Sequence, residues 1–311
     1  MNAQHSPLLV TGAHRSGTTW VGKVLSLTPG TAYIHEPFNP TPKLHKSQIS
    51  IPYWYMYVDS HNEDKYAPYI DSILAHCYPL GAALRQARSV KDFGRISLGF
   101  LKYTSQAAFH QRSIIKDPFA LFSLSWFWRR FSIRPVIVIR HPAAVVASIL
   151  KRGWMFPFWQ WLNDDALIER YLRPFIHEIE NAVQGKKSPL EQATLLWRVL
   201  YTAVAQYQAS YAIDWIFIRH EDISLEPQKQ FQQIFARLNL NWTPRVERFL
   251  RASTDERNPV KPGEGSVFDV FRASATNVKS WQKVLSSEDI KRVRQDTSEV
   301  SELFYRDADW L

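Results

Sequence analysis

An α/β fold with a mostly parallel central sheet and helices on both of its faces is predicted by two features of this 311-residue sequence. Short apolar runs rich in β-branched residues alternate with segments of helical periodicity, which is the order typical of βαβ units. Hydrophobic residues make up 45% of the chain, so a large core can be buried. We therefore expect three layers with the sheet in the middle.

Five short apolar segments are predicted to be strands, and longer periodic segments are predicted to be the helices between them. We expect strands at 7–11, 32–34, 112–116, 134–140 and 213–219, and helices at 19–27, 120–131, 143–152 and 190–211. A last helix should begin at Ser286, because Asp289 three residues later completes a pattern like a capping box. Segment 254–266 is rich in proline and glycine and is expected to be a loop.

Two segments dense in aromatic residues, 51–79 and 154–161, interrupt the alternation. The sequence contains no internal repeat, low-complexity tract or Gly/Ser linker that would mark a domain boundary. We therefore expect a single domain over residues 1–311. Its segments 41–110 and 153–190 are predicted to be aromatic-rich helical inserts that act as lids.

The composition excludes several classes of protein. Cys77 is the only cysteine, so neither an intramolecular disulfide nor a cysteine-rich zinc site can form. No apolar run reaches the length of about 18 residues that spans a bilayer. Residues 1–7 lack the basic segment of a signal peptide. A soluble cytoplasmic enzyme without a transmembrane segment is the expectation.

The net charge of +9 is concentrated in one part of the chain. Between Gln111 and Arg152 there are eight lysines and arginines against a single acid, Asp117. Such a stretch attracts an anion, whether phosphate, sulfate or nucleic acid. A solvated basic face would give the same count, so the charge by itself only permits an anionic partner.

The octapeptide at 12–19, Gly-Ala-His-Arg-Ser-Gly-Thr-Thr, lies where the first strand passes into a helix. Its glycines keep the G-x-x-x-x-G spacing of a P-loop, whose amides converge on a phosphate at the helix N-terminus. The expected phosphate-binding residues are Arg15, Ser16, Gly17, Thr18 and Thr19. Thr18 replaces the Walker lysine, so we expect a nucleotide other than ATP or GTP. A chance glycine pair in a strand-to-helix turn is the alternative.

Residues 15–19 resemble the 5′-phosphosulfate loop of sulfotransferases, which use 3′-phosphoadenosine 5′-phosphosulfate (PAPS). The second signature of that family is a strand ending in arginine, followed eight residues later by a serine on the next helix. Arg140 and Ser148 have this spacing. The resemblance implies a three-layer P-loop-type fold in which these two residues grip the 3′-phosphate of the donor.

Further motifs resemble tyrosylprotein sulfotransferases and bacterial carbohydrate sulfotransferases. Glu36 lies 21 residues after Arg15, the separation that tyrosylprotein enzymes show between their loop arginine and catalytic glutamate. Lys116 begins a Lys-Asp-Pro-Phe segment like theirs, whose lysine sits at the sulfuryl group. Reading back from Trp281 places Ser266 and Arg272 near two further cofactor contacts, with the basic residue shifted by one position.

Sulfuryl transfer needs a base for the acceptor hydroxyl and positive charge for the equatorial oxygens. Glu36 is the expected base, with His35 in reserve, and Lys116 and Arg15 are the expected cations. The alternatives are that Glu36 is a structural carboxylate, that Lys116 is a surface lysine on an edge strand, and that Arg15 only braces the loop. His14, His35 and His141 flank these residues and are each expected to support them or to pack rather than to react, and no metal is required.

The predicted function is PAPS-dependent sulfation of a hydroxyl, with a carbohydrate or glycolipid as the first choice of acceptor. Aryl, peptide-tyrosine and natural-product hydroxyls follow, because aromatic inserts would suit any of these on the acceptor side. A nucleotide kinase and a non-catalytic module that binds nucleotide or polyanion are the rival classes. No nucleic-acid partner is expected, and a peripheral membrane contact is left open.

Overall fold

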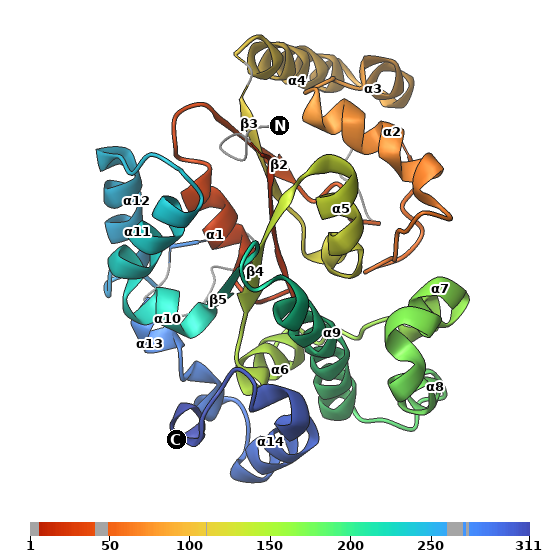
Figure 1. The fold of residues 1–311 in the computed structure, drawn as a ribbon, viewed down its shortest axis with the longest axis vertical. Coiled ribbons are helices and arrows are strands. Elements are labelled where there is room, and N and C mark those ends of the chain that lie inside the picture. The colour runs from red at the N-terminus through yellow and green to blue at the C-terminus, as the bar shows by residue number, and fades with distance from the viewer. Residues whose placement is uncertain (1–5, 41–48, 110, 260–269, 272–273) are drawn as a thin grey trace.

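The computed structural model describes residues 6–40, 49–109, 111–259, 270–271 and 274–311. In this part of the chain five strands form one parallel sheet in the order β2-β3-β1-β4-β5, which confirms the predicted α/β class (Figure 1). The strands are β1 (Leu8–Gly12), β2 (Thr31–His35), β3 (Arg112–Lys116), β4 (Arg134–Ile139) and β5 (Ile216–Arg219).

Helices cover both faces of the sheet, as Figure 1 shows. One face is covered by α1 (Thr18–Leu25), α10 (His220–Leu225), α11 (Pro227–Arg237) and α12 (Pro244–Thr254). The other is covered by α5 (Leu124–Phe131), α6 (Pro142–Leu150) and α9 (Pro189–Tyr211), with α14 (Ser287–Ser301) packed against α6 and α9. The prediction of three layers is confirmed.

The alternation of side chains along the central strand divides the core into two parts. Leu8 and Val10 of β1 pack with α1, α11 and α12, whereas Leu9 packs with the helices of the opposite face. All three are fully buried. A strand buried on both faces needs a continuous apolar run, and this explains why β1 shows no alternation with polar residues.

The two segments predicted to be inserts, 41–110 and 153–190, contain helices in their described residues. The first contains α2 (Glu63–Leu74), α3 (Leu80–Gln86) and α4 (Val90–Ala108). The second contains η3 (Phe158–Asn163), α7 (Asp165–Leu167), η4 (Ile168–Leu172), η5 (Arg173–Phe175) and α8 (Ile176–Val183). After α12 follow α13 (Ser274–Asn277), η6 (Ser280–Lys283) and, beyond α14, η7 (Asp307–Trp310). Their service as lids stays a prediction.

The structure corrects two predicted boundaries. The strand expected at 213–219 begins only at Ile216, because the amides of Asp214 and Trp215 bond to the carbonyl of Tyr211 and finish the preceding helix. The helix expected at 120–131 begins only at Leu124. It is preceded by the 3-10 segment η2 (Pro118–Ser123), which the carboxylate of Asp117 caps through the amide of Phe119.

The other predicted elements are confirmed with small shifts at their ends. The helix expected at 143–152 ends at Leu150, and the strand expected at 134–140 ends at Ile139. Ser286 and Asp289 form the predicted capping box at the start of α14. Of the loop expected at 254–266, Thr254 still belongs to α12, residues 255–259 are irregular, and 260–266 lie outside the described residues.

Candidate active site

Three neighbouring parallel strands end at the same edge of the sheet and carry the candidate residues there. In register, His35 of β2 pairs with Lys116 of β3, and Lys116 pairs with Val10 of β1. Glu36 directly follows β2, and the turn from Gly12 to Gly17 directly follows β1. Ligands of open α/β sheets bind beyond such carboxyl ends. The fold therefore brings the predicted base, the predicted lysine and the glycine-rich turn to one place.

Glu36 and Lys116 form a buried ion pair between Oε1 and Nζ. The amide of Glu36 donates to the carbonyl of Lys116 at 2.8 Å, and Asn39 Nδ2 donates to the second carboxylate oxygen at 2.8 Å. Lys116 is 1% exposed and belongs to an interior strand, so the alternative of a surface lysine on an edge strand is wrong. Glu36 has φ of 48°, a left-handed conformation that is uncommon outside glycine.

The environment shifts the pKa of both partners. Burial by itself would raise the pKa of Glu36, but the charge and hydrogen bond of Lys116, together with His35 and Asn39, outweigh it and hold the pKa below its usual range. Burial lowers the pKa of Lys116, and Glu36 offsets part of this change. A carboxylate and an ammonium therefore face each other at neutral pH.

Two residues that sequence reasoning did not assign to the site support this pair. Asp117 accepts hydrogen bonds from the amides of Phe38 (2.5 Å) and Phe119 (2.9 Å), which fixes the turn after Glu36 onto the end of β3. Burial raises the pKa of Asp117 to about 7. Gly22 lets α1 pass close to β3, since a Cβ there would lie 3.1 Å from that of Lys116. In the sequence, an acid directly after a predicted strand was the available signal for Asp117. Nothing in the sequence marked Gly22.

The glycine-rich turn depends on both of its glycines. At Gly12, with φ of 148°, a Cβ would lie 2.3 Å from the carbonyl oxygen of Val138. At Gly17, with φ of 92°, it would lie 2.5 Å from Cδ2 of His220. Gly17 caps α1 without a side chain, so an anion can approach the amides of the first turn. Because the turn has no room for a Cβ at either position, the alternative that the two glycines occur there by chance does not fit.

The two sequence signatures meet in space. Arg15 Nε donates to Ser148 Oγ at 3.1 Å, and Arg140 Nη1 donates to the carbonyl of Arg15 at 2.6 Å. Tyr201 fixes the start of the turn after β4, because its hydroxyl accepts from the amide of Arg140 at 3.1 Å. The structure thus gathers Arg15, Arg140 and Ser148 into one cluster, in which two guanidinium groups attract anions.

The histidines near these residues differ in their surroundings. Burial, followed by the charge of Arg15, lowers the pKa of His14 to about 4. Burial lowers the pKa of His141 to about 3, and its ring stacks on Trp281 at 5.0 Å. His35 Nε2 lies 3.6 Å from Glu36 Oε2, so His35 is the histidine that adjoins the carboxylate. His14 and His141 are both buried, and their roles as supporting or packing residues stay predictions.

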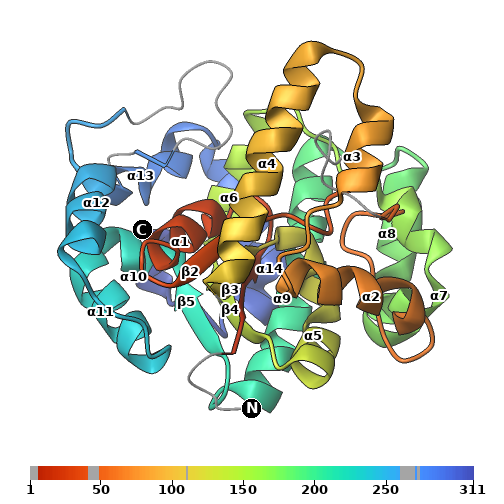
Figure 2. The ribbon, with the colours of Figure 1, turned by 90° about the horizontal axis from the view of Figure 1, so that it is seen from above.

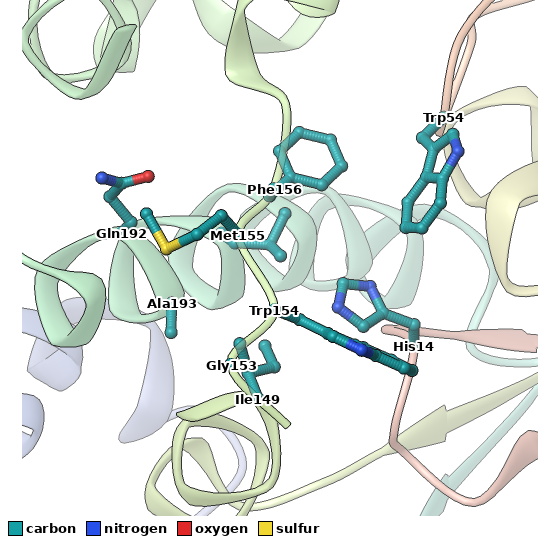
Figure 3. Close-up of a pocket in the computed structure, with 10 residues that line it drawn as sticks. His14, Trp54, Ile149, Gly153, Trp154, Met155, Phe156, Gln192 and Ala193 are labelled. Atoms are coloured by element: carbon teal, nitrogen blue, oxygen red, sulfur yellow. The ribbon is translucent and has the colours of Figure 1, made fainter. Parts of the chain in front are cut away.

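A pocket of about 240 Å³ lies beside the glycine-rich turn (Figure 3). Figure 3 shows His14 next to Trp154, with Trp54 across from them. Both tryptophans come from the aromatic segments that interrupt the βα alternation. The lining consists of His14, Trp54, Ile149, Gly153, Trp154, Met155, Phe156, Gln192, Ala193 and Leu196. It offers few polar side chains, so it suits an apolar ring or chain.

Two further observations concern the described residues only. They contain no group of three or more His, Cys, Asp or Glu side chains placed to hold a metal ion. None of the helices in the described ranges is both long and apolar enough to cross a bilayer. Ser266 and Arg272, predicted to contact the cofactor, lie outside the described residues.

Comparison with known proteins decides the family. A model described as the sulfotransferase family matches residues 7–244. The chain belongs to the sulfotransferase family. As a member it is a transferase of sulfuryl groups, and the alternative of a nucleotide kinase is set aside. The search of curated proteins gave no match.

Solved structures of sulfotransferases resemble this sulfotransferase over nearly its whole length. The sulfotransferase domain from the curacin biosynthetic pathway is 12% identical, with a TM-score of 0.50, and the match covers 97% of this chain and 98% of that one. A mouse sulfotransferase complexed with PAP is 12% identical over 98% and 86% of the two chains, with a TM-score of 0.47. A domain from the Synechococcus PCC 7002 olefin synthase is 13% identical over 97% and 96%, with a TM-score of 0.46. The first likeness supports the P-loop-like fold.

Proposed function

We propose that this sulfotransferase uses PAPS to sulfate a hydroxyl of a carbohydrate that carries an apolar group, as a glycolipid does. The observation that carries the proposal is the buried pair of Glu36 and Lys116 beside the glycine-rich turn. The apolar lining of the adjacent pocket supports an acceptor with a ring or chain to bury. An aryl hydroxyl is the second candidate, because Trp54 and Trp154 would also receive an aromatic ring.

The residues present fit a donor that carries an anionic group at each end. The amides after Gly17 fit the 5′-phosphosulfate, since Gly17 leaves the first turn of α1 open. Arg140 and Ser148 would hold the 3′-phosphate through charge-assisted and hydroxyl hydrogen bonds. Arg15, already bonded to Ser148, adjoins both ends. PAPS when bound supplies the sulfuryl group that the acceptor receives.

Glu36 is proposed to take the proton of the acceptor hydroxyl. Its lowered pKa keeps the carboxylate ionised at neutral pH, and Asn39 and Lys116 hold it in one orientation. The left-handed backbone of Glu36 directs the side chain toward Lys116 across the ends of β2 and β3. A base held in this way loses little conformational entropy when the acceptor arrives.

Lys116 is proposed to stabilise the negative charge that develops during transfer. Its ammonium is a compact charge in a buried site, where electrostatic interactions are stronger than in water. The negative charge is greatest in the transition state, so the contribution of Lys116 belongs to kcat more than to donor KM. Arg15 would contribute a second cation on the side of the donor.

The test of the base compares Glu36→Gln with His35→Gln. We expect Glu36→Gln to lower kcat by about 10²–10⁴-fold while the affinity for adenosine 3′,5′-bisphosphate is retained. His35→Gln, which alters the neighbour of the carboxylate, should change kcat only a few-fold. Near-normal turnover of Glu36→Gln, or an equally severe loss in His35→Gln, would contradict the assignment.

Donor and acceptor are tested separately. Adenosine 3′,5′-bisphosphate should raise the melting temperature of the protein, whereas ATP with magnesium should not. An acceptor screen with labelled PAPS should then include glycolipids, matched sugars without the lipid, and phenols. Transfer to the free sugar in preference to the glycolipid would refute the role proposed for the apolar pocket.

A further inference from the structure

Helix α4 turns its apolar side away from the protein. Val90, Leu98 and Leu101 are 88%, 71% and 64% exposed, and Phe93 is exposed beside them. We call these four residues the outer face of α4. An amphipathic helix of a globular protein normally buries such a face against the core. An exposed apolar patch of this kind marks an interaction site.

The inner side of α4 makes the contacts with the rest of the molecule. Ile96 is buried, and Gly99 lies so close to Tyr78 that a Cβ would be 2.8 Å from its ring. Tyr78 also contacts the rings of Phe100 and Tyr103. Among the described residues, helix packing therefore uses the inner side, and the outer face stays exposed.

Positive charge borders the outer face. Between residues 80 and 109 the sequence has five basic residues, Arg85, Arg88, Lys91, Arg95 and Lys102, and one acidic residue, Asp92. Lys91 and Lys102 are 11 residues apart, which is three helical turns, so they lie on one side of α4. Arg95, one turn after Lys91, lies on that side too; its Nη1 is 3.5 Å from Oδ1 of Asp92, and its side chain is 70% exposed. An apolar stripe edged by basic residues is typical of helices that lie in a membrane interface.

The position of the helix is suited to a flat partner. Figure 2 shows α4 lying across the outside of the molecule, with the end next to α3 extending beyond its body. A projecting helix offers a convex surface, whereas a protein partner would need a matching groove. A fluid bilayer needs no such groove, because lipids rearrange around an inserted helix.

We propose that the outer face of α4 docks on the surface of a bilayer that contains anionic lipids. The apolar side chains would enter the interface while Lys91, Arg95 and Lys102 contact the lipid phosphates. A second copy of the chain fits less well, since it would bring like charges together. This inference rests on α4 alone and is independent of the proposed reaction.

Flotation with lipid vesicles tests the docking. The full-length protein should bind vesicles of phosphatidylcholine with about one third phosphatidylserine, and binding should weaken as salt is added. Leu98→Gln with Leu101→Gln should weaken binding by at least about tenfold. The matched control is Leu303→Gln, because Leu303 is 63% exposed on another surface, and it should bind like the wild type.

A second pair of variants tests the charges. Lys91→Gln with Lys102→Gln should weaken binding by about 20- to 30-fold, at roughly fivefold for each lysine near an anionic surface. Lys186→Gln with Lys291→Gln removes two exposed lysines elsewhere and is the control. Vesicle binding that is absent in the wild type, or unchanged in both α4 variants, overturns the proposal.

Two more measurements distinguish the membrane from other partners. With Cys77→Ser as the background, a polarity-sensitive dye on Leu98→Cys should shift to the blue on vesicle addition, and lipid-borne quenchers should reach it. A wild-type dimer in solution that Leu98→Gln with Leu101→Gln converts to monomer would assign the face to a second copy. That outcome overturns the proposal. So does a dye whose emission does not shift to the blue although the labelled protein is bound to vesicles.

Discussion

Replacing Lys116 by methionine leaves the carboxylate of Glu36 without its partner in a buried site. The side chains of Lys116 and Glu36 are only 2% and 11% exposed. Removal of one member of such a pair costs about 3–5 kcal/mol of unfolding free energy. The hydrogen bond from Asn39 and the residual solvent contact of Glu36 remain, so we expect the free energy of unfolding to fall by about 3 kcal/mol.

The double variant Lys116→Met with Glu36→Gln should recover most of this stability. It leaves no unpaired charge, and replacement of a buried ion pair by uncharged groups is often close to neutral. We expect it to unfold within about 1–2 kcal/mol of the wild type. Its kcat should nevertheless stay about 10²-fold or more below the wild-type value, because the proposed base and cation are both absent.

The contribution of Glu36 to the free energy of unfolding should change with pH in opposite directions in the wild type and in Lys116→Met. In the wild type the pKa of Glu36 is lowered, so the pair adds stability above the unfolded pKa and loses it as pH falls through the folded pKa. In Lys116→Met the charge of Lys116 is gone, and we expect burial, the largest remaining effect, to outweigh His35 and Asn39 and to raise the pKa of Glu36. The variant should then regain stability relative to the wild type as pH falls from about 7 to about 5.

Urea unfolding followed by tryptophan fluorescence at both pH values measures these differences, and kcat is measured on the same samples. A double variant as unstable as Lys116→Met would refute the coupling of the pair. So would a stability difference between Lys116→Met and wild type that does not narrow at lower pH. Full kcat in the double variant would refute the catalytic role of both residues.

Three further predictions concern the donor site. Gly17→Ala should lower the free energy of unfolding by about 1–3 kcal/mol and weaken donor binding, because its backbone is left-handed and its Cβ would collide with His220. Gly185→Ala, also left-handed but with open space around it, is the control and should cost about 1 kcal/mol, so equal losses would exclude the collision. Ser148→Ala should weaken binding of adenosine 3′,5′-bisphosphate by about 0.5–1.5 kcal/mol and leave adenosine 5′-phosphate unaffected, as titration calorimetry can show. Arg140→Ala should affect both ligands, since Arg140 also braces the carbonyl of Arg15, and an effect confined to the bisphosphate would contradict that bracing role.

The sequence by itself determined the class of fold and the candidate residues. Short apolar runs located the five strands, since strands of a sheet covered on both faces are mostly apolar, although Thr11, Ser113 and Lys116 are buried polar exceptions. The spacing of Gly12 and Gly17 located the turn, because few other residues tolerate its backbone. Motif spacing selected Glu36, Lys116, Arg140 and Ser148, and their roles in catalysis and donor binding stay predictions.

Only the tertiary structure decided which of these residues touch. Glu36 and Lys116 are 80 residues apart and meet because β2 and β3 pair in a register that no local pattern specifies. The supporting role of Gly22 left no signal in the sequence, and the contact of Asp117 with the amide of Phe38 also depends on how neighbouring elements pack. The sequence predicted only a helical insert over 41–110, and which side of α4 faces solvent depends on what the fold packs against it. Local chemistry therefore sets what each segment can become, whereas burial and contact are properties of the assembled chain.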